Sequence, residues 1–420
     1  MSFETISVIG LGYIGLPTAV TFATHQKKVI GVDINQCVVD TINKGKVHIV
    51  EPYLDEAAKT AVETGYLKAF TTPQRADVFL ITVPTPLKND YKPDLSYIIS
   101  AAESIAQLLK KGDLIILEST SPIGTTKLIA RQLSVIRPDL TFPHQEGENS
   151  DIDIAYCPER VLPGKIMIEL IRNDRVIGGM TIKSSKRASE LYKIFLVGEC
   201  MITNEKTAEM CKLTENSFRD VNIAFANELS FICAEQGINV WELISLANRH
   251  PRVNILQSGP GVGGHCIAVD PWFIVYQNPN HSRLIHAARL VNDSKPIWVV
   301  NQVKAVLEDC LKETGKKVNE VKIACFGLSF KPDIDDLRGS PAMQITKMIT
   351  YFDVNIVYVV EPNINKLPKA LDCLCQLVSI EVAIDNADII LLLVDHKQFK
   401  EINAEQIKQK WIIDTKGVWC

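Results

Sequence analysis

The sequence lacks three features, and each absence excludes a class of protein. No apolar run approaches the ~20 residues that a helix needs to span a bilayer, so we expect no membrane insertion. The formal net charge of the 420 residues is -4, and no basic stripe is interleaved with aromatic residues, which disfavours nucleic acid as a partner. The N-terminus carries Glu4 where a secretory leader carries lysine or arginine, so we expect a cytoplasmic protein.

The cysteines lack a pattern as well. There are 11 of them, an odd number, without the spacing of a disulfide framework. This is typical of reduced thiols in a cytosolic protein. Cys373 and Cys375 are too close together for a familiar zinc pair, and no second pair accompanies them, so we expect no metal site.

What the sequence does contain is an alternation of strands and helices. Hydrophobic residues make up 46% and charged residues 22%, which is ordinary for a soluble globular protein. Strand-like runs alternate with helical patterns in residues 1–200 and again in residues 313–420, and helical patterns dominate residues 201–312. The sequence therefore predicts an α/β fold with two Rossmann-like domains joined by a helical middle region that contains a long central helix.

A glycine motif joins the first predicted strand, at 5–9, to the first predicted helix, at 16–24. It contains Gly10, Gly12 and Gly15 in the pattern G-x-G-x-x-G. The first glycine permits the tight turn, the second lets the main chain approach a pyrophosphate, and the third lets helix and strand pack closely. Asp33 ends the next strand, where a carboxylate binds the adenosine ribose and repels a 2′-phosphate. These residues predict NAD as the cofactor; the alternative is a glycine turn without function.

Polar residues follow the next predicted strands, at 78–83, 114–117 and 152–156. In a doubly wound sheet, ligands lie beyond the carboxyl ends of the strands. Thr85, Thr120 and Thr126 are therefore candidate cofactor contacts, although threonine also caps helices in such places. Glu159 is a candidate catalytic group, and the alternative is an exposed salt bridge with Arg160. A strand at 176–179 is predicted to close this sheet.

A helical pattern without proline or glycine runs through residues 203–236. Lys212, Asn216 and Arg219 form a polar stripe on it, spaced i, i+4 and i+7. They suit an anionic, hydroxyl-rich ligand, but periodicity alone favours a solvated surface. Another face of the helix is apolar and needs a partner, such as a second subunit. Its side chains are Met210, Phe218, Val221, Phe225, Leu229 and Ile232.

A cysteine ends a glycine-rich run at residues 259–266. Such a loop can hold the thiol of Cys266 at one fixed place beside a substrate, because glycine lets the backbone approach a ligand. The alternative is a tight turn in which Cys266 is a small buried hydrophobe. The basic loop with His250 and Arg252 precedes this run and suits phosphate recognition. Lys416 follows the last predicted strand, at 411–414, where a second α/β unit would bind a ligand.

Taken in order, these segments resemble the UDP-glucose/GDP-mannose dehydrogenase family over essentially the whole chain. The family's fold implies an NAD-binding domain at 1–200, a central and dimerisation domain at 201–312, and a UDP-sugar-binding domain at 313–420. It also implies a homodimer or a higher homo-oligomer. The resemblance rests on the glycine motif, Thr85, residues 157–160, Lys212 with Asn216, residues 261–266 with Asp270, and Phe330-Lys331 with Arg338.

The segment 158–164 reads Pro-Glu-Arg-Val-Leu-Pro-Gly, which is more similar to the UDP-N-acetylhexosamine branch of the family than to the UDP-glucose branch. This implies a four-electron oxidation of UDP-N-acetyl-D-mannosamine at C6 to the uronate, for a surface polysaccharide such as enterobacterial common antigen. UDP-N-acetylglucosamine, UDP-N-acetylgalactosamine and UDP-glucose are alternative substrates. A two-electron hydroxyacid dehydrogenase and a non-enzymatic NAD sensor are more remote alternatives. Gly339 departs from the family, whose members often carry glutamate there.

The resemblance also implies catalytic roles. Cys266 is the expected nucleophile, which holds the sugar as a thiohemiacetal and then as a thioester. Lys212 with Asn216 is the expected acid/base and oxyanion partner. Glu159 is the expected base for hydrolysis of the thioester, and Asp270 is expected to help orient water and the lysine.

The remaining matched residues are expected to position the reactants. Thr120, like Asp270, is expected to orient water and Lys212. The residues expected to contact the UDP-sugar are Arg160, Val161, Lys212, Asn216, Arg219, His250, Arg252, Gly263, Phe330, Lys331 and Lys416. Those expected to contact NAD are Gly10, Gly12, Tyr13, Ile14, Gly15, Asp33, Thr85, Thr126 and Arg338.

Overall fold

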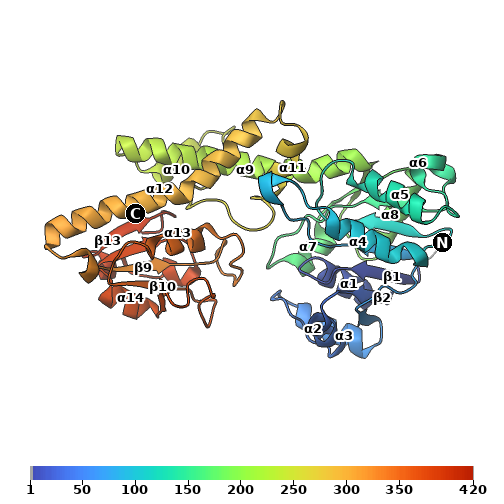
Figure 1. The fold of residues 1–420 in the computed structure, drawn as a ribbon, viewed down its shortest axis with the longest axis horizontal. Helices are drawn as coiled ribbons and strands as arrows, with labels where there is room; N and C mark the ends of the chain where they lie inside the picture. The colour runs from blue at the N-terminus through green and yellow to red at the C-terminus, as the bar shows by residue number, and fades with distance from the viewer. Residues whose placement is uncertain (1–2, 420) are drawn as a thin grey trace. The chain divides into compact units, whose positions relative to one another are not determined.

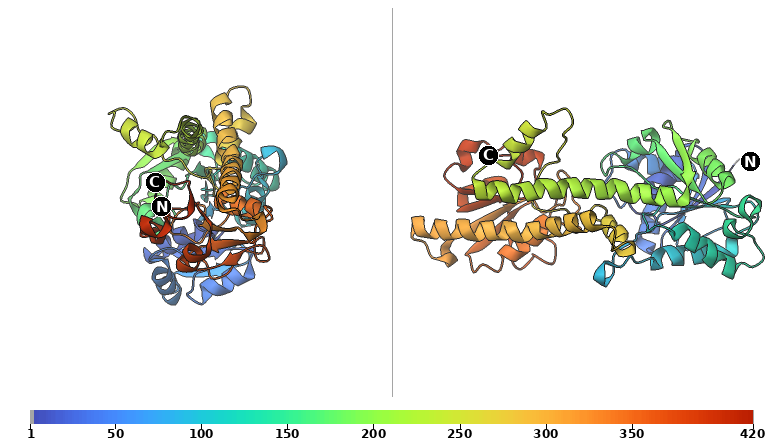
Figure 2. Two further views of the ribbon diagram at one scale, coloured as in Figure 1. Left: turned by 90° about the vertical axis from the view of Figure 1, so that its left-hand side faces the viewer. Right: turned by 90° about the horizontal axis from the view of Figure 1, so that it is seen from above.

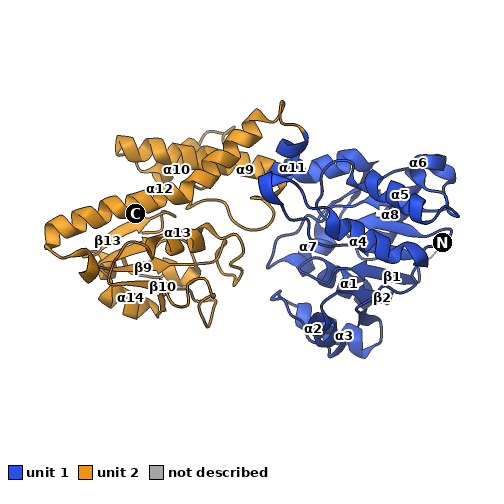
Figure 3. Cartoon of the chain, in the orientation of Figure 1, with its two compact units in different colours: residues 1–215, 272–277 blue, residues 216–271, 278–420 orange. Residues whose placement is uncertain are grey.

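The computed structural model describes residues 3–419 and divides into two compact units (Figure 3). Unit 1 contains the chain up to Glu215 together with Trp272–Gln277, and unit 2 contains Asn216–Pro271 together with the chain from Asn278 onward. Within residues 3–419, no helix combines the length and the apolar character that crossing a membrane requires.

Unit 1 is built on an eight-stranded sheet with the order β3-β2-β1-β4-β5-β6-β7-β8 (Figure 1). Strands β1 to β6 are parallel, β7 is antiparallel to β6, and β8 is parallel to β7. The central strands are fully buried apolar runs, as expected for a sheet covered on both faces. The strands are β1 (Thr5–Ile9), β2 (Lys28–Val32), β3 (Leu67–Phe70), β4 (Val78–Ile81), β5 (Leu114–Leu117), β6 (Asp153–Tyr156), β7 (Arg175–Gly179) and β8 (Cys200–Asn204).

Helices cover both faces of this sheet over two apolar cores. One core takes side chains from α1, α2, α3 and α8, and the other takes them from α4 and α5. The helices are α1 (Gly15–Thr24), α2 (Gln36–Asn43), α3 (Leu54–Glu63), α4 (Ser96–Ile105), α5 (Thr125–Ile136), α6 (Pro143–Glu146), α7 (Ile166–Arg172) and α8 (Ile182–Tyr192).

The prediction that the strand at 176–179 closes the sheet is wrong, because β8 pairs along its outer edge. The reason is physical: all five residues of β8 are exposed or half-buried. An edge strand of this kind has neither a continuous apolar run nor a clear alternation, which are the patterns that reveal a strand in a sequence.

The long central helix is α9 (Glu205–Gln236), which begins in unit 1 and continues in unit 2. Its 32 residues contain no proline or glycine, so nothing in the sequence interrupts the backbone hydrogen bonds. It begins two residues later than the sequence predicts, because Thr203 and Asn204 belong to β8.

Unit 2 is built on a five-stranded parallel sheet with the order β11-β10-β9-β12-β13. The mainly parallel sheet of unit 1, the parallel sheet of unit 2 and the long helix confirm the predicted α/β fold class. The strands are β9 (Lys322–Phe326), β10 (Ile356–Val360), β11 (Gln376–Leu377), β12 (Ile389–Leu392) and β13 (Trp411–Asp414). The helices lying wholly in unit 2 are α10 (Val240–Ala247), α12 (Arg283–Thr314), α13 (Pro341–Ile349), α14 (Ile380–Asn386), α15 (Lys397–Lys400) and α16 (Ala404–Ile407); α11 (Asp270–Gln277) begins there.

Helix α12 and the unit 2 part of α9 lie side by side, as both views in Figure 2 show. Buried polar contacts join them: Arg289 Nη1 donates to Asp220 Oδ1 at 2.6 Å, and Asn227 Nδ2 donates to Asn292 Oδ1 at 2.9 Å. Asn227 Oδ1 also accepts the N–H of Gly259 at 3.0 Å. The helix pair therefore holds the start of the loop that carries Cys266.

Candidate functional site

The three motif glycines have the geometry that dinucleotide binding requires. Gly10 has φ +96°, which L side chains rarely adopt. A Cβ atom on Gly15 would lie 1.8 Å from Gly10 O, so only glycine lets α1 pack this closely on β1. A Cβ atom on Gly12 would meet nothing within 4 Å, so the chain there faces open space. This space, beside the N-terminus of α1, fits a pyrophosphate.

Asp33 lies beside this turn, at the carboxyl end of β2. Its Oδ2 atom accepts the N–H of Leu11 at 3.0 Å, and its Oδ1 atom accepts the N–H of Asn35 at 2.9 Å. The carboxylate is half-buried and fixed by the backbone. Tyr13 and Ile14 follow in the same turn, and Ile14 is the residue that precedes α1. The predicted cofactor residues of this segment are thus together.

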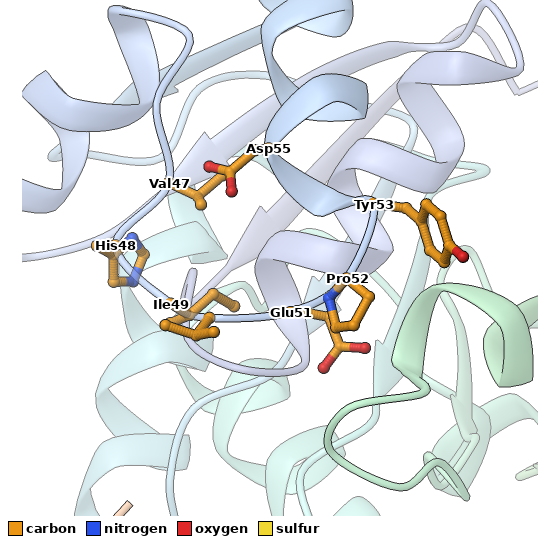
Figure 4. Close-up of a pocket in the computed structure, with 8 residues that line it drawn as sticks. Val47, His48, Ile49, Glu51, Pro52, Tyr53 and Asp55 are labelled. Atoms are coloured by element: carbon orange, nitrogen blue, oxygen red, sulfur yellow. The ribbon is translucent and has the colours of Figure 1, made fainter. Parts of the chain in front are cut away.

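A cavity of about 560 Å³ lies next to Asp33 and contains a residue that sequence reasoning missed (Figure 4). Burial lowers the pKa of His48, and the neighbouring Asp33 carboxylate and Leu11 backbone only partly offset this effect. No motif surrounds His48, so the sequence carries no signal for it. The lining residues are Val47, His48, Ile49, Val50, Glu51, Pro52, Tyr53 and Asp55.

Glu51, from the same cavity wall, was also missed. Its carboxylate accepts the N–H groups of Gly164 and Ile166, each at 2.7 Å, and so holds the far end of the 157–164 segment. The partners lie 113 and 115 residues away in the sequence, which explains why no local pattern reveals the contact.

The three candidate threonines differ in their surroundings. The hydroxyl of Thr85 is buried without a hydrogen-bond partner in the described part of the chain, and such an orphaned group suits a ligand. Thr126 instead donates both its N–H and its hydroxyl to Glu209 Oε1, at 2.8 and 2.7 Å. Thr120 is half-buried just after β5. Glu209, a further residue missed from sequence, thus occupies the N-terminus of α5.

Glu159 and Lys212 come together in unit 1. Lys212 Nζ donates to the backbone oxygen of Glu159 at 2.6 Å. Burial raises the pKa of Glu159 to about 7, although the positive charge of Lys212 opposes the shift. Its carboxyl accepts the N–H of Val161. Arg160 pairs with Glu215 at 2.8 Å, so Glu159 is a buried acid and not the partner in an exposed salt bridge.

Asn216 and Asp270 come together in unit 2, where Asn216 Nδ2 donates to Asp270 Oδ2 at 2.5 Å. Both side chains are buried. Asp270 also donates its N–H to the backbone oxygen of Cys266 at 2.8 Å, which fixes the end of the cysteine loop. Cys266 itself is exposed. The alternative that it is a small buried hydrophobe is therefore wrong.

The cysteine loop packs closely on a second predicted segment. A Cβ atom on Gly263 would lie 2.6 Å from Pro341 Cδ, 2.8 Å from Gly339 O and 2.8 Å from Phe330 Cβ. Only glycine allows this approach. Gly339 has φ +59°, a conformation that disfavours the glutamate often found there in the family. Arg338, one residue earlier, forms an ion pair with Asp336 at 2.6 Å.

The other predicted substrate residues are spread over unit 2. Lys416 Nζ pairs with Asp395 at 3.3 Å, and a Cβ atom on Gly259 would lie 3.5 Å from it. Lys331 follows Phe330 and accepts the hydroxyl of Ser329 at its backbone oxygen. The remaining three, Arg219, His250 and Arg252, are exposed. Among residues 3–419, no three histidine, cysteine or acidic side chains gather in a way that would hold a metal ion.

Comparison with known proteins gives matches along the whole chain. Three domains of the UDP-glucose/GDP-mannose dehydrogenase family match: the NAD binding domain at residues 4–196, the central domain at 206–294 and the UDP binding domain at 324–420. UDP-N-acetyl-D-mannosamine dehydrogenase of Yersinia pestis is 68% identical over 419 residues, and the match covers 100% of both chains.

Two further relatives extend this result. NDP-N-acetyl-D-galactosaminuronic acid dehydrogenase of Ralstonia nicotianae is 58% identical, and the match covers 100% of this chain and 97% of the relative. The solved structure of UDP-D-ManNAc dehydrogenase from Pyrococcus horikoshii is 38% identical with a TM-score of 0.87, over 99% of this chain and 96% of that one. With the geometry of the glycine turn and Asp33, these matches establish that the chain belongs to the UDP-glucose/GDP-mannose dehydrogenase family and is an NAD-dependent oxidoreductase.

Proposed function

We propose that the chain oxidises C6 of UDP-N-acetyl-D-mannosamine to a carboxylate, with two NAD for each sugar nucleotide. The observation that carries the chemistry is a buried carboxyl with a pKa of about 7, Glu159, whose backbone oxygen holds the ammonium of Lys212. The choice of sugar follows the names of the relatives that are 67–68% identical over the full length. UDP-N-acetylglucosamine, UDP-N-acetylgalactosamine and UDP-glucose are the alternative substrates.

The proposed organisation follows the same lines. Residues 1–200 bind NAD, residues 201–312 form the central domain, and residues 313–420 bind the UDP moiety. The protein acts in the cytoplasm, where thiols stay reduced. Its product, a nucleotide-linked uronic acid, serves the synthesis of a bacterial surface polysaccharide such as enterobacterial common antigen.

In the first oxidation, the ammonium of Lys212 positions the C6 hydroxyl. Negative charge develops on the hydroxyl oxygen, and the ammonium stabilises this charge. NAD, when bound, would supply the hydride acceptor at this carbon, once in each of the two oxidations. Asn216 offers a second donor, and its amide is held in place by Asp270. Thr120 and a water molecule that it orients would carry the proton of the C6 hydroxyl to solvent. The product of this half-reaction is an aldehyde at C6.

In the second oxidation, the thiolate of Cys266 adds to the aldehyde carbon and the carbonyl oxygen takes up a proton, which gives a thiohemiacetal. Loss of the second hydride and of the hydroxyl proton gives a thioester. Water then adds to the thioester carbon while Glu159 accepts its proton, the carbon–sulfur bond breaks, and the thiol is released with the acid. A pKa of about 7 suits a group that must accept a proton near neutrality.

The expected stoichiometry tests this function. Purified protein supplied with limiting UDP-N-acetyl-D-mannosamine should form two NADH per sugar nucleotide, measured by absorbance, with no aldehyde released. The variant Cys266→Ser should form no carboxylate, because serine is a much weaker nucleophile than a thiolate. Cys373→Ser, at another exposed cysteine, is the matched control and should keep the ratio of two. A ratio of one, or full activity of Cys266→Ser, would refute the proposal.

Glu159 gives a second test, because the ionised form of its carboxyl is needed for catalysis but destabilises the folded protein. Its folded-state pKa of about 7 lies above the ordinary 4.5, so the folded protein binds the proton more tightly and stability falls as the pH rises between these values. The loss amounts to roughly 3 kcal/mol. Glu159→Gln should therefore raise the melting temperature at pH 8 but not at pH 5, and should abolish turnover. Glu228→Gln, at an exposed position of α9, should change neither. An equal effect at both pH values would contradict the assignment.

We also propose that the chain forms a homodimer or a higher homo-oligomer through α9. Part of the apolar face predicted from its sequence is exposed in the single chain: Phe218, Phe225 and Ile232, spaced seven residues apart, are 67%, 49% and 51% exposed, whereas Val221 and Leu229 are half-buried. Large apolar side chains in a continuous row on a helix are typical of a protein interface.

The row on α9 predicts the effect of introducing charge. The double variant Phe218→Lys/Phe225→Lys should shift the protein to monomer in sedimentation velocity, because each lysine would be buried unpaired at the interface. Val197→Lys, at an apolar residue that is 81% exposed and lies outside this row, is the control and should keep the wild-type assembly. An unchanged sedimentation coefficient of the double variant would exclude this surface.

A further inference from the structure

The start of the second sheet repeats the turn that forms the NAD fingerprint in the first. In unit 1, Gly10 follows β1 with φ +96° and donates its N–H to Val32 O at 2.8 Å. In unit 2, Gly327 follows β9 with φ +94° and donates its N–H to Val360 O at 2.8 Å. The two turns are therefore equivalent in geometry, although the second has no further glycines of the motif.

The acid that follows the neighbouring strand is repeated too. Leu11 N donates to Asp33 at 3.0 Å, and Leu328 N donates to Glu361 at 2.7 Å. In each unit, the residue two positions after the acid also donates its N–H to it, at 2.9 and 3.1 Å. Glu361 thus occupies in unit 2 the place that Asp33 occupies in unit 1.

Asp33 and Glu361 differ in their burial and in their further contacts. Asp33 is half-buried and its neighbouring turn faces open space, whereas Glu361 is 4% exposed and its Oε2 atom also contacts His396 Nε2 at 3.0 Å. Burial raises the pKa of Glu361, but the histidine and the backbone donors outweigh it and hold the pKa below its usual value. The carboxylate is therefore an internal anchor, and a ribose cannot reach it.

His396 connects the carboxylate of Glu361 to the loop that contains the predicted substrate residues Phe330 and Lys331. Its Nδ1 atom accepts the N–H of Asp333 at 2.9 Å, so the ring proton is on Nε2 and is donated to Glu361. The ring also contacts the hydroxyl of Ser329 at 3.4 Å, and this hydroxyl donates to Lys331 O at 2.7 Å. Both ends of the segment 329–333 are thus tied to one buried imidazole.

The residue before this histidine holds the other predicted substrate lysine. Asp395 Oδ1 pairs with Lys416 at 3.3 Å, and its Oδ2 atom pairs with Lys400 at 2.8 Å. Asp395 and His396 lie just beyond the carboxyl end of β12, where the ligands of a parallel sheet gather. One dipeptide therefore supports Lys416 on one side and the 329–333 segment on the other.

We propose that Asp395-His396 is the positioning element of the UDP-sugar site, and that Glu361 serves as its anchor in place of binding a ribose. The proposal rests on the proposed function, since it assumes that Phe330, Lys331 and Lys416 contact the UDP-sugar. Neither member of the dipeptide takes part in hydride or acyl transfer. Their loss changes nucleotide affinity and leaves the chemical steps intact.

Two substitutions of the histidine separate its contact with Asp333 from its contact with Glu361. His396→Asn keeps an acceptor near the Nδ1 position for Asp333 N–H, whereas His396→Gln keeps a donor near the Nε2 position for Glu361. Because the Asp333 contact fixes the loop, His396→Gln should raise the KM for UDP-N-acetyl-D-mannosamine and the Kd for UDP at least about tenfold. His396→Asn should stay within about threefold of the wild type. In both variants kcat and the KM for NAD should stay within about twofold.

Asp395 offers an independent variant with a matched control. Asp395→Asn removes the charge that holds Lys416 and should raise the same KM and Kd, again with an unchanged KM for NAD. Lys400→Gln breaks the other ion pair of Asp395 at an exposed side chain and should leave all constants unchanged. Melting temperatures of all variants identify any that fail to fold. If a histidine variant fails to fold, Asp395→Asn still tests whether the dipeptide positions the UDP-sugar site.

The measurements distinguish a failure of this proposal from a failure of the proposed enzymatic activity. Calorimetric titration with UDP alone measures the site without turnover, so a protein that binds UDP but oxidises no UDP-N-acetyl-D-mannosamine refutes the substrate and still tests the dipeptide. Wild-type affinity for UDP in His396→Gln and Asp395→Asn would overturn the proposal. An equal rise in the KM for NAD and for the sugar nucleotide would also overturn it, because it marks general structural damage. A wild-type protein without affinity for UDP would refute both.

Discussion

At the carboxyl ends of the parallel strands, carboxylates accept the backbone N–H groups that the sheets leave unpaired. A buried N–H group without an acceptor is costly, and the loops beyond the strands must supply one. Asp33 does this after β2 and Glu361 after β10. Asp414 does it as the last residue of β13, where its two oxygens accept four successive N–H groups from Lys416 to Trp419. The loops that carry the predicted ligand residues are ordered by these bonds.

The same solution recurs away from strand ends. Glu209 receives the N–H groups at the start of α5, and Glu51 receives those at the start of α7. A helix N-terminus attracts negative charge, and in unit 1 the protein's own acids take further such places. Asp94 accepts the N–H of Ser96 at the start of α4, and Glu148 accepts those of Ile182 and Lys183 at the start of α8. The N-terminus of α1 differs, because the space beside Gly12 is open. The open space beside Gly12 thus leaves the N-terminus of α1 available to a dinucleotide phosphate.

Much of this fold can be predicted from the sequence, because its strands and its glycine motif are indicated by patterns of neighbouring residues. The strands β5 and β13 were predicted with the bounds that the structure has, since each is a short apolar or half-buried run between polar turns. The NAD fingerprint is a contiguous motif, and its cofactor prediction is confirmed. The edge strand β8, in contrast, has no pattern, and the roles of Glu209 and His396 depend on partners 83 and 63 residues away. Contacts of that range cannot be read from spacing. The assigned roles of Cys266, Lys212 and the other site residues stay predictions.

The exposure of the cysteines determines which thiols an oxidant can reach. Cys157 and Cys325 are buried, which raises the pKa of each thiol and keeps it protonated, whereas Cys266 lies open to solvent. The exposed sulfur of Cys266 is within reach of peroxide, and oxidation beyond the sulfenic stage is irreversible in most proteins. In the mechanism proposed above, such oxidation would stop catalysis at this sulfur and would leave the buried thiols unchanged.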